Sequence, residues 1–440
     1  MHPKNIFRKV LLAACLAALA VPLESHAQTS SLNAFSPYTM YGLGDMWQQG
    51  NAETRIMGGA GVAYRNGTSI NYLNPASLSA IPQHSAIFNF GASGQNYYSK
   101  TALNSTSKNN FTFSDLAIAF PLASKVGFAV SMTPYSAVGY ETNYVDENPE
   151  VIENIGRAIY NYRGEGGLSQ LNASLGVEVT KGLSLGASLI YYFGSLERRY
   201  DSSLENLLQP IEFSNVMSFT KTQVSQVLFS VGAQYQFRIG KNEGLSVGAT
   251  FQPKGTIKSR YTKEQMSVRD AVTDTITMIK ARNPIVLPAK FEAGIFYNHG
   301  RRWVVVADYS YQNWKNAFEI PAGEEIGLRS QHQIRAGVSF TPNPGSYRQA
   351  LKRWSYRLGL RYSTNYMTFQ GQNLEDMAVS LGFVIPFKRD KYSRVTIGAE
   401  LGQRGTTRNG QIRDRYVNIF AGFTLFGEAE DLWFRRQKLN

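Results

Sequence analysis

Three arginines have the spacing that best fits ligand binding in this chain. Arg357 and Arg361 lie four residues apart in an alternating segment, so their side chains share one face, and Arg335 lies in a neighbouring segment of the same kind. A guanidinium group binds a carboxylate through paired hydrogen bonds. The three arginines therefore predict either a clamp for the carboxylate of a ligand or partners for acidic side chains of the chain itself. Both interpretations stay open on the sequence alone.

Other candidate residues give no sign of catalysis. His84, His299 and His332 are isolated, without a nucleophile–base context or the spacing of metal ligands. A small-residue run contains Gly58, Gly59 and Gly61 but lacks the lysine and the strand–helix setting of a phosphate loop. We therefore predict that the protein is not an enzyme and has no metal site and no cofactor.

Residues 1–27 have the layout of an export signal. A basic start is followed by the apolar run Val10–Val21 and by the small-x-small cleavage pattern Ser25-His26-Ala27. A lipoprotein signal ending at Cys15 is the alternative. Cys15 is the only cysteine of the chain, so a mature protein beginning at Gln28 has none, which excludes disulfides and thiolate sites.

The charge of the chain is strongly basic. Loss of the signal, with three basic residues and one acidic residue, lowers the formal charge from +13 to +11. Export and the scattering of lysine and arginine among acidic residues argue against a nucleic-acid partner. A basic surface facing anionic lipid headgroups is the simpler interpretation, and it predicts outer-membrane lipid as a partner.

From Gln83 onward the apolar residues follow a period of two. In Trp354–Tyr362 one face carries only aromatic residues and leucine, and the other carries serine, arginine and glycine. Such stripes end in aromatic residues, and short turns alternate with long polar segments at 143–161, 201–217 and 262–285. The pattern predicts an all-β protein: a transmembrane antiparallel β-barrel of about 14 strands in the cell outer membrane. We expect these strands near 83–98, 109–122, 125–142, 162–180, 183–200, 216–238, 244–261, 286–298, 302–318, 328–341, 353–365, 374–386, 393–404 and 411–426.

A glycine flanked by apolar residues recurs through these strands, for example at Gly176, Gly186 and Gly359. By parity the glycines face inward. They indicate either bends in the barrel wall or close approach of another backbone. The Gly- and Ala-rich stretch within residues 28–82 is available for such an approach, so we expect this segment to be a small hatch, or plug, in the lumen.

The hatch region carries the motif of a known family. Asn74-Pro75-Ala76 follows the run that contains Gly58, Gly59 and Gly61, and about 14 strands come after it. This order resembles the FadL family of outer-membrane transporters for long-chain fatty acids and other hydrophobic compounds. Asn74-Pro75-Ala76 is similar to the family's NPA motif, and Leu287–Phe291 resembles the opening of a strand in its second half.

The resemblance implies passive uptake of hydrophobic small molecules, with lateral release through a gap at the third strand. Pro134 lies in the expected third strand, and proline removes a hydrogen-bond donor from a β-ladder. Pro134 is therefore the candidate kink; the alternative places it above the membrane, near the rim.

The sequence thus predicts four parts and one function, with an alternative. The parts are a signal peptide (1–27), a hatch (28–82), an outer-membrane barrel (83–427) and a periplasmic tail (428–440). The predicted function is a channel for passive uptake of a hydrophobic, fatty-acid-like ligand, with lateral release through the barrel wall. The alternative is a FadL-like barrel that binds an envelope protein, as a subunit of an envelope or secretion machine. An apolar cavity that opens sideways would favour the first, and a closed or charged lumen would count against it.

Overall fold

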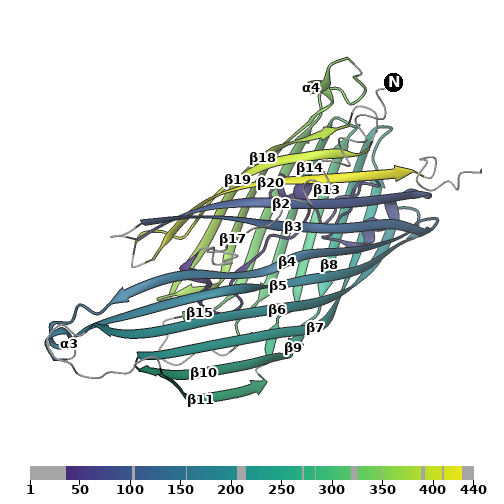
Figure 1. The fold of residues 1–440 in the computed structure, drawn as a ribbon. Coiled ribbons are helices and arrows are strands. Elements are labelled where there is room, and N and C mark those ends of the chain that lie inside the picture. Colours follow the sequence, from purple (N-terminus) through teal and green to yellow (C-terminus); the bar gives the residue numbers. More distant parts are fainter. Residues whose placement is uncertain are drawn as a thin grey trace, which may run out of the picture.

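The wall of the molecule is a closed antiparallel β-barrel. The computed structural model describes residues 36–101, 105–154, 156–205, 215–269, 272–282, 284–318, 326–346, 348–387, 392–408 and 411–428. Within these residues 18 strands form one sheet, and 14 of them close the barrel, as predicted (Figure 1). The wall strands are β2 (Ser85–Lys100), β3 (Ser105–Ala123), β4 (Val126–Val145), β5 (Arg157–Thr180), β6 (Leu183–Glu205), β7 (Asn215–Arg238), β8 (Glu243–Gln252), β13 (Lys290–His299), β14 (Trp303–Asn313), β16 (Ser330–Phe340), β17 (Ser355–Phe369), β18 (Gln372–Pro386), β19 (Arg394–Arg404) and β20 (Arg413–Glu428).

Each strand pairs with the next along the wall, and β20 pairs with β2 to close it. Alternation along the strands sets the two faces: in β18 buried and exposed residues alternate almost throughout. Exposed Leu358, Leu360 and Leu381 belong to the outward stripes. Near the short turns the stripes end in aromatic pairs such as Trp303–Phe340, whose ring centroids lie 4.4 Å apart. An apolar outer band with aromatic rings at its border suits a strand wall in a bilayer, and the protein is an outer-membrane barrel.

Prolines shorten two of the expected strands. The strand expected over 244–261 ends at Gln252, directly before Pro253, and the strand expected from 286 begins at Lys290, after Pro288. Between them β9 (Gly255–Ile257) pairs with β12 (Ile285–Leu287) in a small separate sheet. Proline cannot donate to the ladder, which explains both interruptions.

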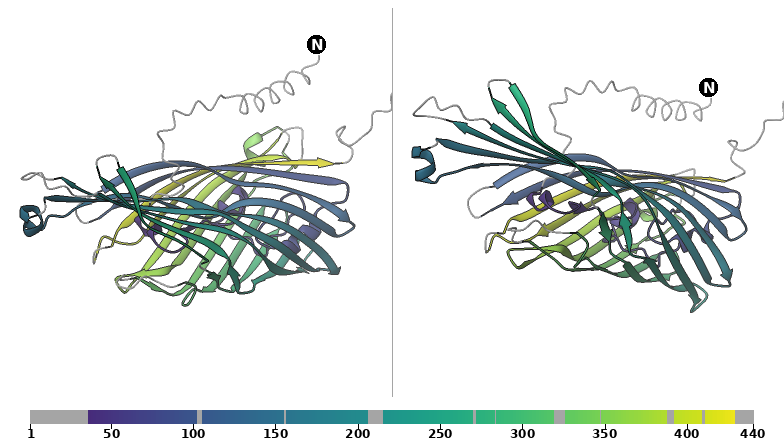
Figure 2. Two further views of the ribbon diagram at one scale, coloured as in Figure 1. Left: turned by 60° about the horizontal axis from the view of Figure 1, so that its bottom comes forward. Right: turned by 90° about the horizontal axis from the view of Figure 1, so that it is seen from below.

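The segments expected to be long loops contain strand residues as well, and 143–161 also contains α3 (Pro149–Asn154). β5, β6 and β7 continue through 157–161, 201–205 and 215–217, and the expected loop 262–285 contains most of β10 (Ser259–Arg269) and β11 (Val272–Arg282). β10 pairs with β7 on one side and β11 on the other. Together the outer parts of β4–β7 and the strands β10 and β11 extend well beyond the rest of the wall, and we call this sheet the wing (Figure 2).

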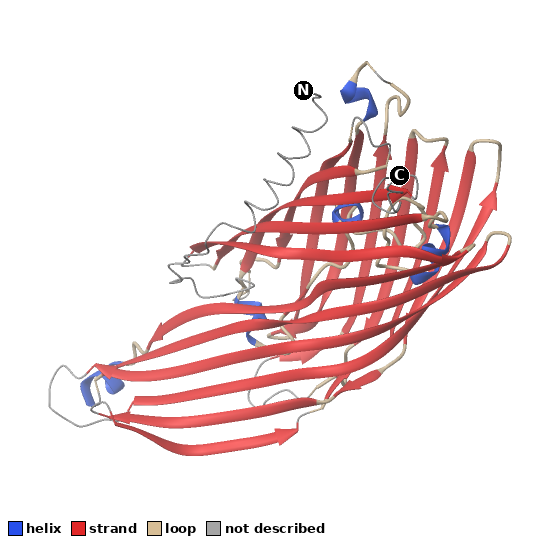
Figure 3. Cartoon of the chain, turned by 45° about the vertical axis from the view of Figure 1, so that its right-hand side comes forward, coloured by secondary structure: helices blue, strands red, loops and turns tan. Residues whose placement is uncertain are grey.

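The described helices are all short (Figure 3). α3 (Pro149–Asn154) lies at the tip of the wing, α4 (Ala350–Arg353) precedes β17, and β15 (Ile326–Leu328) pairs with β17. Within the described residues no helix is long and apolar enough to cross a membrane. The remaining elements belong to residues 36–82, which we call the N-terminal segment: η1 (Pro37–Met40), β1 (Asp45–Met46), α2 (Ala52–Arg55) and η2 (Pro75–Ala80). The expected signal peptide and nearly all of the expected tail lie outside the described residues.

Candidate functional site

The N-terminal segment lies inside the barrel, where most of its residues are buried and only Pro82 is exposed (Figure 1). Two asparagine caps shape it. Asn51 begins α2, where its Oδ1 accepts a hydrogen bond from the amide of Thr54 at 3.0 Å. Asn74 begins η2 by accepting from the amide of Ala76 at 3.0 Å, and Pro75 occupies the first helical position, where no amide hydrogen is needed. These two capped turns make the segment compact, so that it contacts the barrel wall on several of its sides.

Asn74-Pro75-Ala76 packs against the inner wall. The Asn74 side chain donates to the carbonyl of Val62 at 2.9 Å and to the carbonyl of Ala233, on β7, at 3.1 Å. One asparagine therefore fixes the segment's own fold and attaches it to the barrel.

The small-residue run contacts another part of the wall. Gly58 and Gly59 have positive φ angles of 68° and 80°, which side-chain-bearing residues rarely adopt. Gly58 donates to Ser380 Oγ at 3.0 Å, and Gly61 donates to Asp308 Oδ2 at 2.6 Å, whereas the amides of Gly59 and Ala60 bond within the segment. The run thus presents backbone donors to acceptors on β18 and β14.

The inward glycines of the wall admit the N-terminal segment. A Cβ atom on Gly176, Gly186 or Gly232 would overlap residues 74–76, and a Cβ atom on Gly337 would lie 2.7 Å from the Cα of Met57. On Gly359 it would overlap the amide of Gly58. Of the two interpretations of the glycine repeat, close approach of another backbone therefore applies at these positions.

The three arginines singled out in the sequence all contact carboxylates of the chain itself. Arg335 lies 2.7 Å from Glu292 on β13, and Arg357 lies 3.4 Å from Glu53 of the N-terminal segment. Arg361 lies 3.1 Å from Glu400. These side chains are almost wholly buried, so each arginine already has the carboxylate partner that a ligand would otherwise supply.

Glu53 joins the N-terminal segment to the wall through two arginines. Arg394 on β19 contacts one of its oxygens and Arg357 the other. Burial alone would raise the pKa of Glu53, but the charges of Arg394 and Arg357 outweigh it and hold the pKa below its ordinary value. Glu53 is therefore ionised at neutral pH.

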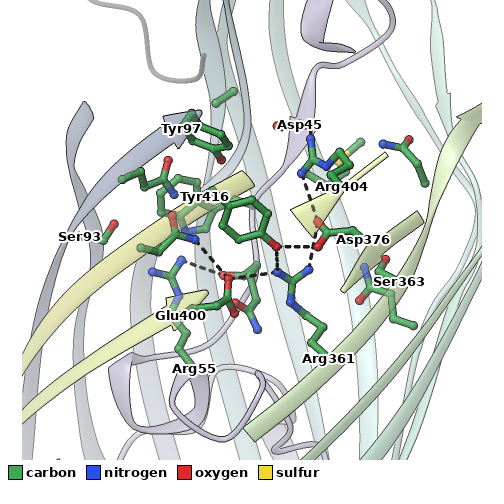
Figure 4. A pocket seen from close by; sticks show the side chains of 18 of the residues that line it. Asp45, Arg55, Ser93, Tyr97, Arg361, Ser363, Asp376, Glu400, Arg404 and Tyr416 are labelled. Carbon is green, nitrogen blue, oxygen red and sulfur yellow. Dashed lines mark hydrogen bonds and ion pairs between the residues drawn. The ribbon is translucent and has the colours of Figure 1, made fainter. Parts of the chain in front are cut away.

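A second network links β17, β18 and β19 beside the segment (Figure 4). Asp376 lies 3.6 Å from Arg361 and 3.3 Å from Arg404, and Arg404 also contacts Asp45 of β1. The cavity that these residues line has a volume of about 100 Å³, and a second lumen cavity beside Gln170 and Glu292 has about 140 Å³. Pockets for drug-sized ligands are typically about 300–1,000 Å³, so both lumen cavities are small and largely polar.

A larger cavity lies at the mouth, on the side of the wing. It has a volume of about 630 Å³ and is lined by aromatic and apolar side chains, including Tyr41, Tyr140 and Phe318. Arg198 also lines this cavity and donates hydrogen bonds to the carbonyls of Met40 and Gly42, both at 2.8 Å.

The wall separates at the third strand. β3 and β4 pair from Ala123–Val126 only as far as Leu116–Met132, although both strands continue. Pro134 follows two residues later, at an irregularity in the register between β4 and β5. Its missing amide hydrogen removes one ladder donor at this place.

The N-terminal segment covers the edge of β4 that β3 leaves. Asp45 and Met46 of β1 pair with Ala137 and Ser136, and the Gln49 side chain donates to the carbonyl of Pro134 at 3.0 Å. On the other side of the separation Phe111 of β3 is 78% exposed. The structure thus places Pro134 where the wall separates and where the N-terminal segment replaces a neighbouring strand.

Sequence reasoning missed the acidic half of these networks: Asp45, Glu53, Asp308 and Asp376. Inward parity could have found Asp308, which stands opposite Arg335 in the β14–β16 register. Nothing local points to Glu53, whose partners lie more than 300 residues away along the chain. Within the described residues no group of three or more metal-ligating side chains occurs.

These features define an outer-membrane barrel of the FadL-like fold with a segment packed in its lumen. Similar solved structures are the Pseudomonas putida toluene transporter TodX (16% identity, TM-score 0.56, covering 87% of this chain and 99% of that one) and the Ralstonia pickettii toluene transporter TbuX (14%, 0.53, 85% and 97%). A Pseudomonas aeruginosa FadL homologue is similar as well (13%, 0.52, 87% and 98%). At these identities the likeness shows the fold, and it confirms the predicted FadL-like architecture.

The chain itself belongs to the BamG family, whose sequence model matches residues 6–440. No curated protein matches the sequence.

Proposed function

We propose that this protein is a protein-binding subunit of an envelope or secretion machine in the outer membrane. In this proposal the N-terminal segment acts as a hatch that closes the lumen, and the wing presents the binding surface. The observation that carries it is the wing: a sheet that stands beyond the barrel and is accessible on both faces. The segments 261–268 and 216–221 contain no buried residue, and only Ala158 is buried in 157–163.

A sheet of this kind is unusual in a protein that acts alone. Sheets are normally stable because at least one face is buried against another layer. The wing instead carries a row of aromatic rings across β4, β5 and β6: Tyr144 is exposed, Tyr160 and Tyr200 are half-buried, and neighbouring centroids lie 6.0 and 6.2 Å apart. Tyrosine is enriched where proteins meet, because it offers a large rigid surface with a polar end. A partner protein covering the wing would supply the missing layer.

The lumen supports the same proposal. Glu53 is paired across the boundary between the N-terminal segment and the wall, other charged residues are paired within the wall, and the two lumen cavities are small and lined mostly by polar residues. Opening a path for an apolar molecule would separate buried ion pairs, and breaking such a pair by removing one partner costs about 3–5 kcal/mol. A hydrophobic ligand gains little from such an environment.

Uptake of a hydrophobic small molecule is the second candidate, and two observations favour it. The 630 Å³ cavity at the mouth is large enough for such a ligand and is lined by aromatic residues. The separation of β3 from β4 lies where a ligand could leave toward the bilayer. In this candidate the N-terminal segment would have to release the edge of β4.

Purification of the tagged full-length protein from its own envelope in mild detergent, followed by native mass spectrometry, separates the two candidates. We expect a protein partner in fixed stoichiometry and also bound outer-membrane lipid. Recovery of the barrel without any protein partner but with a fatty acid or an aromatic hydrocarbon bound would contradict the proposal and favour uptake.

A further inference from the structure

β11 forms the outer edge of the wing. It pairs with β10 from Arg260–Arg282 to Arg269–Val272, and within the described part of the chain it has no partner on its other side. A strand in this position presents a row of unpaired amide and carbonyl groups. Water can hydrate such a row, and another extended strand can pair with it along its whole length.

The exposed edge is only partly protected. Natural edge strands are generally short, bulged, interrupted by proline or charged along their length. β11 has 11 residues, and its centre, Thr275–Ile279, is uncharged and rich in β-branched side chains. Ile276 is 60% exposed and Met278 is 53% exposed. The β10–β11 register skips Ile276, opposite the step from Gln265 to Met266, so β11 has a bulge at its centre and pairs regularly only from Thr277 to Arg282.

The charges at the base of this edge have one sign. Arg260 stands opposite Arg282 in the register, and Lys280 is two residues away on the same strand. None of the three makes an ion pair with another described residue, whereas Arg163 and Lys221 elsewhere on the wing are paired with glutamates. The edge thus combines an apolar centre with unpaired positive charge at one end.

We propose that β11 accepts an extended, acidic segment of a partner protein as an added strand. The proposal rests on the proposed function and names the surface and the kind of segment that the partner would use. The uncharged part of the segment pairs along 277–279, where β11 is regular, and its acidic residues lie beside Lys280 and Arg282.

Site-specific cross-linking in isolated outer-membrane fragments, which are open to reagents on both sides, tests the contact. In the expected cysteine-free mature chain, Met278→Cys labelled with a benzophenone maleimide places a photoreactive group on the edge. Leu351→Cys, at a side chain 60% exposed on α4 at the opposite end of the barrel, is the matched control. We expect a cross-link from position 278 to one acidic, extended peptide of another protein and none from position 351. A cross-link to a second copy of this chain, or none at all, would overturn the proposal.

Substitutions on the edge test its contribution to binding. Ile276→Lys with Met278→Lys should lower the amount of partner recovered per barrel at least tenfold, and Lys280→Glu with Arg282→Glu should lower it as well. Leu351→Lys should leave recovery unchanged. Because β11 is not a wall strand, all variants should keep the heat-modifiable migration of a folded barrel on gels.

Failure of the proposed function and failure of the role of β11 give different results. If the wild-type protein recovers no partner, the proposed function fails, and the inference fails with it. If the wild-type protein recovers a partner and both edge variants recover it equally well, only the role of β11 is wrong.

Discussion

Single atoms decide how closely the N-terminal segment can approach the wall. Wherever an inward glycine faces this segment, the missing Cβ leaves room for a backbone on the other side. The sequence revealed the glycine repeat and its inward parity, but it could not distinguish a bend in the wall from such an approach. That distinction depends on contacts between residues hundreds of positions apart, which alternation within one strand does not encode.

Gly359→Ala should destabilise the barrel. The added Cβ would overlap the amide of Gly58 and the carbonyl carbon of Met57, and overpacking of this kind costs about 1–3 kcal/mol. Gly94→Ala is the control, since its nearest neighbour would be 3.9 Å away. The measurement is the temperature at which the folded band converts to the unfolded band on gels. Equal temperatures for the two variants would show that the segment is not held against Gly359.

Glu53→Gln should loosen the N-terminal segment, because Arg394 and Arg357 would lose their charged partner. Removing one member of a buried ion pair costs about 3–5 kcal/mol. We expect faster cleavage within residues 36–82 by an added protease at pH 7. Equal cleavage rates in the variant and the wild type would argue against the role of this ion pair.

The same residue predicts a pH dependence. The folded protein holds the pKa of Glu53 below the ordinary value of 4.5, so its stabilising effect is present above that value and is lost as the pH falls through the folded pKa. The difference in melting temperature between wild type and Glu53→Gln should therefore be constant from pH 7 down to about 5. It should shrink at lower pH; a constant difference down to pH 3 would contradict this account.

Among the elements, β1 and β4 form the most informative pair. β1 has two residues, yet it occupies the edge where the wall separates. Met46→Cys with Ser136→Cys places two cysteines at directly paired positions, and opposed residues in antiparallel strands have Cα atoms about 4.5–5.5 Å apart, within the range of a disulfide.

We expect this disulfide to form in the exported protein and to leave partner recovery unchanged. The Met46→Cys and Ser136→Cys single variants serve as controls. If the locked protein loses a measurable uptake of hydrophobic compounds that a reducing agent restores, the second candidate function is favoured instead.

The elements also show where sequence reasoning succeeds. The wall strands have a strict period of two because one face meets lipid and the other a packed interior, and this period predicted their number. Most of β10 and all of β11 were expected to be loop. Neither face of the wing meets lipid or a core, so these strands have no alternating apolar stripe from which they could be predicted. Pro253 and Pro288 are visible in the sequence and could have placed the interruptions between β8 and β13.

At the scale of the whole molecule, the barrel wall closes without any strand pairing from β10 or β11 of the wing. The wall closes through β7–β8 and β8–β13, and β10 and β11 take no part in these pairings. Ile257 and Ile285 face each other in the β9–β12 pair, so the ends of the intervening segment lie close together.

Replacing residues 258–283 by a short Gly-Ser linker should therefore leave a folded barrel that has lost its partner. Heat-modifiable migration on gels measures the first expectation, and recovery of the partner measures the second. An unfolded product would show that the wing contributes to closure. Full recovery of the partner would place the binding surface elsewhere.

The contacts of the N-terminal segment also constrain how the protein is made. Residues 36–82 touch strands from β4 to β20, nearly the whole circumference, and those contacts include buried charges. The segment fills most of the lumen and leaves cavities of about 100–140 Å³ beside it. We therefore expect residues 36–82 to take their place before the wall closes, with the pairing of β20 with β2 as the step that encloses them.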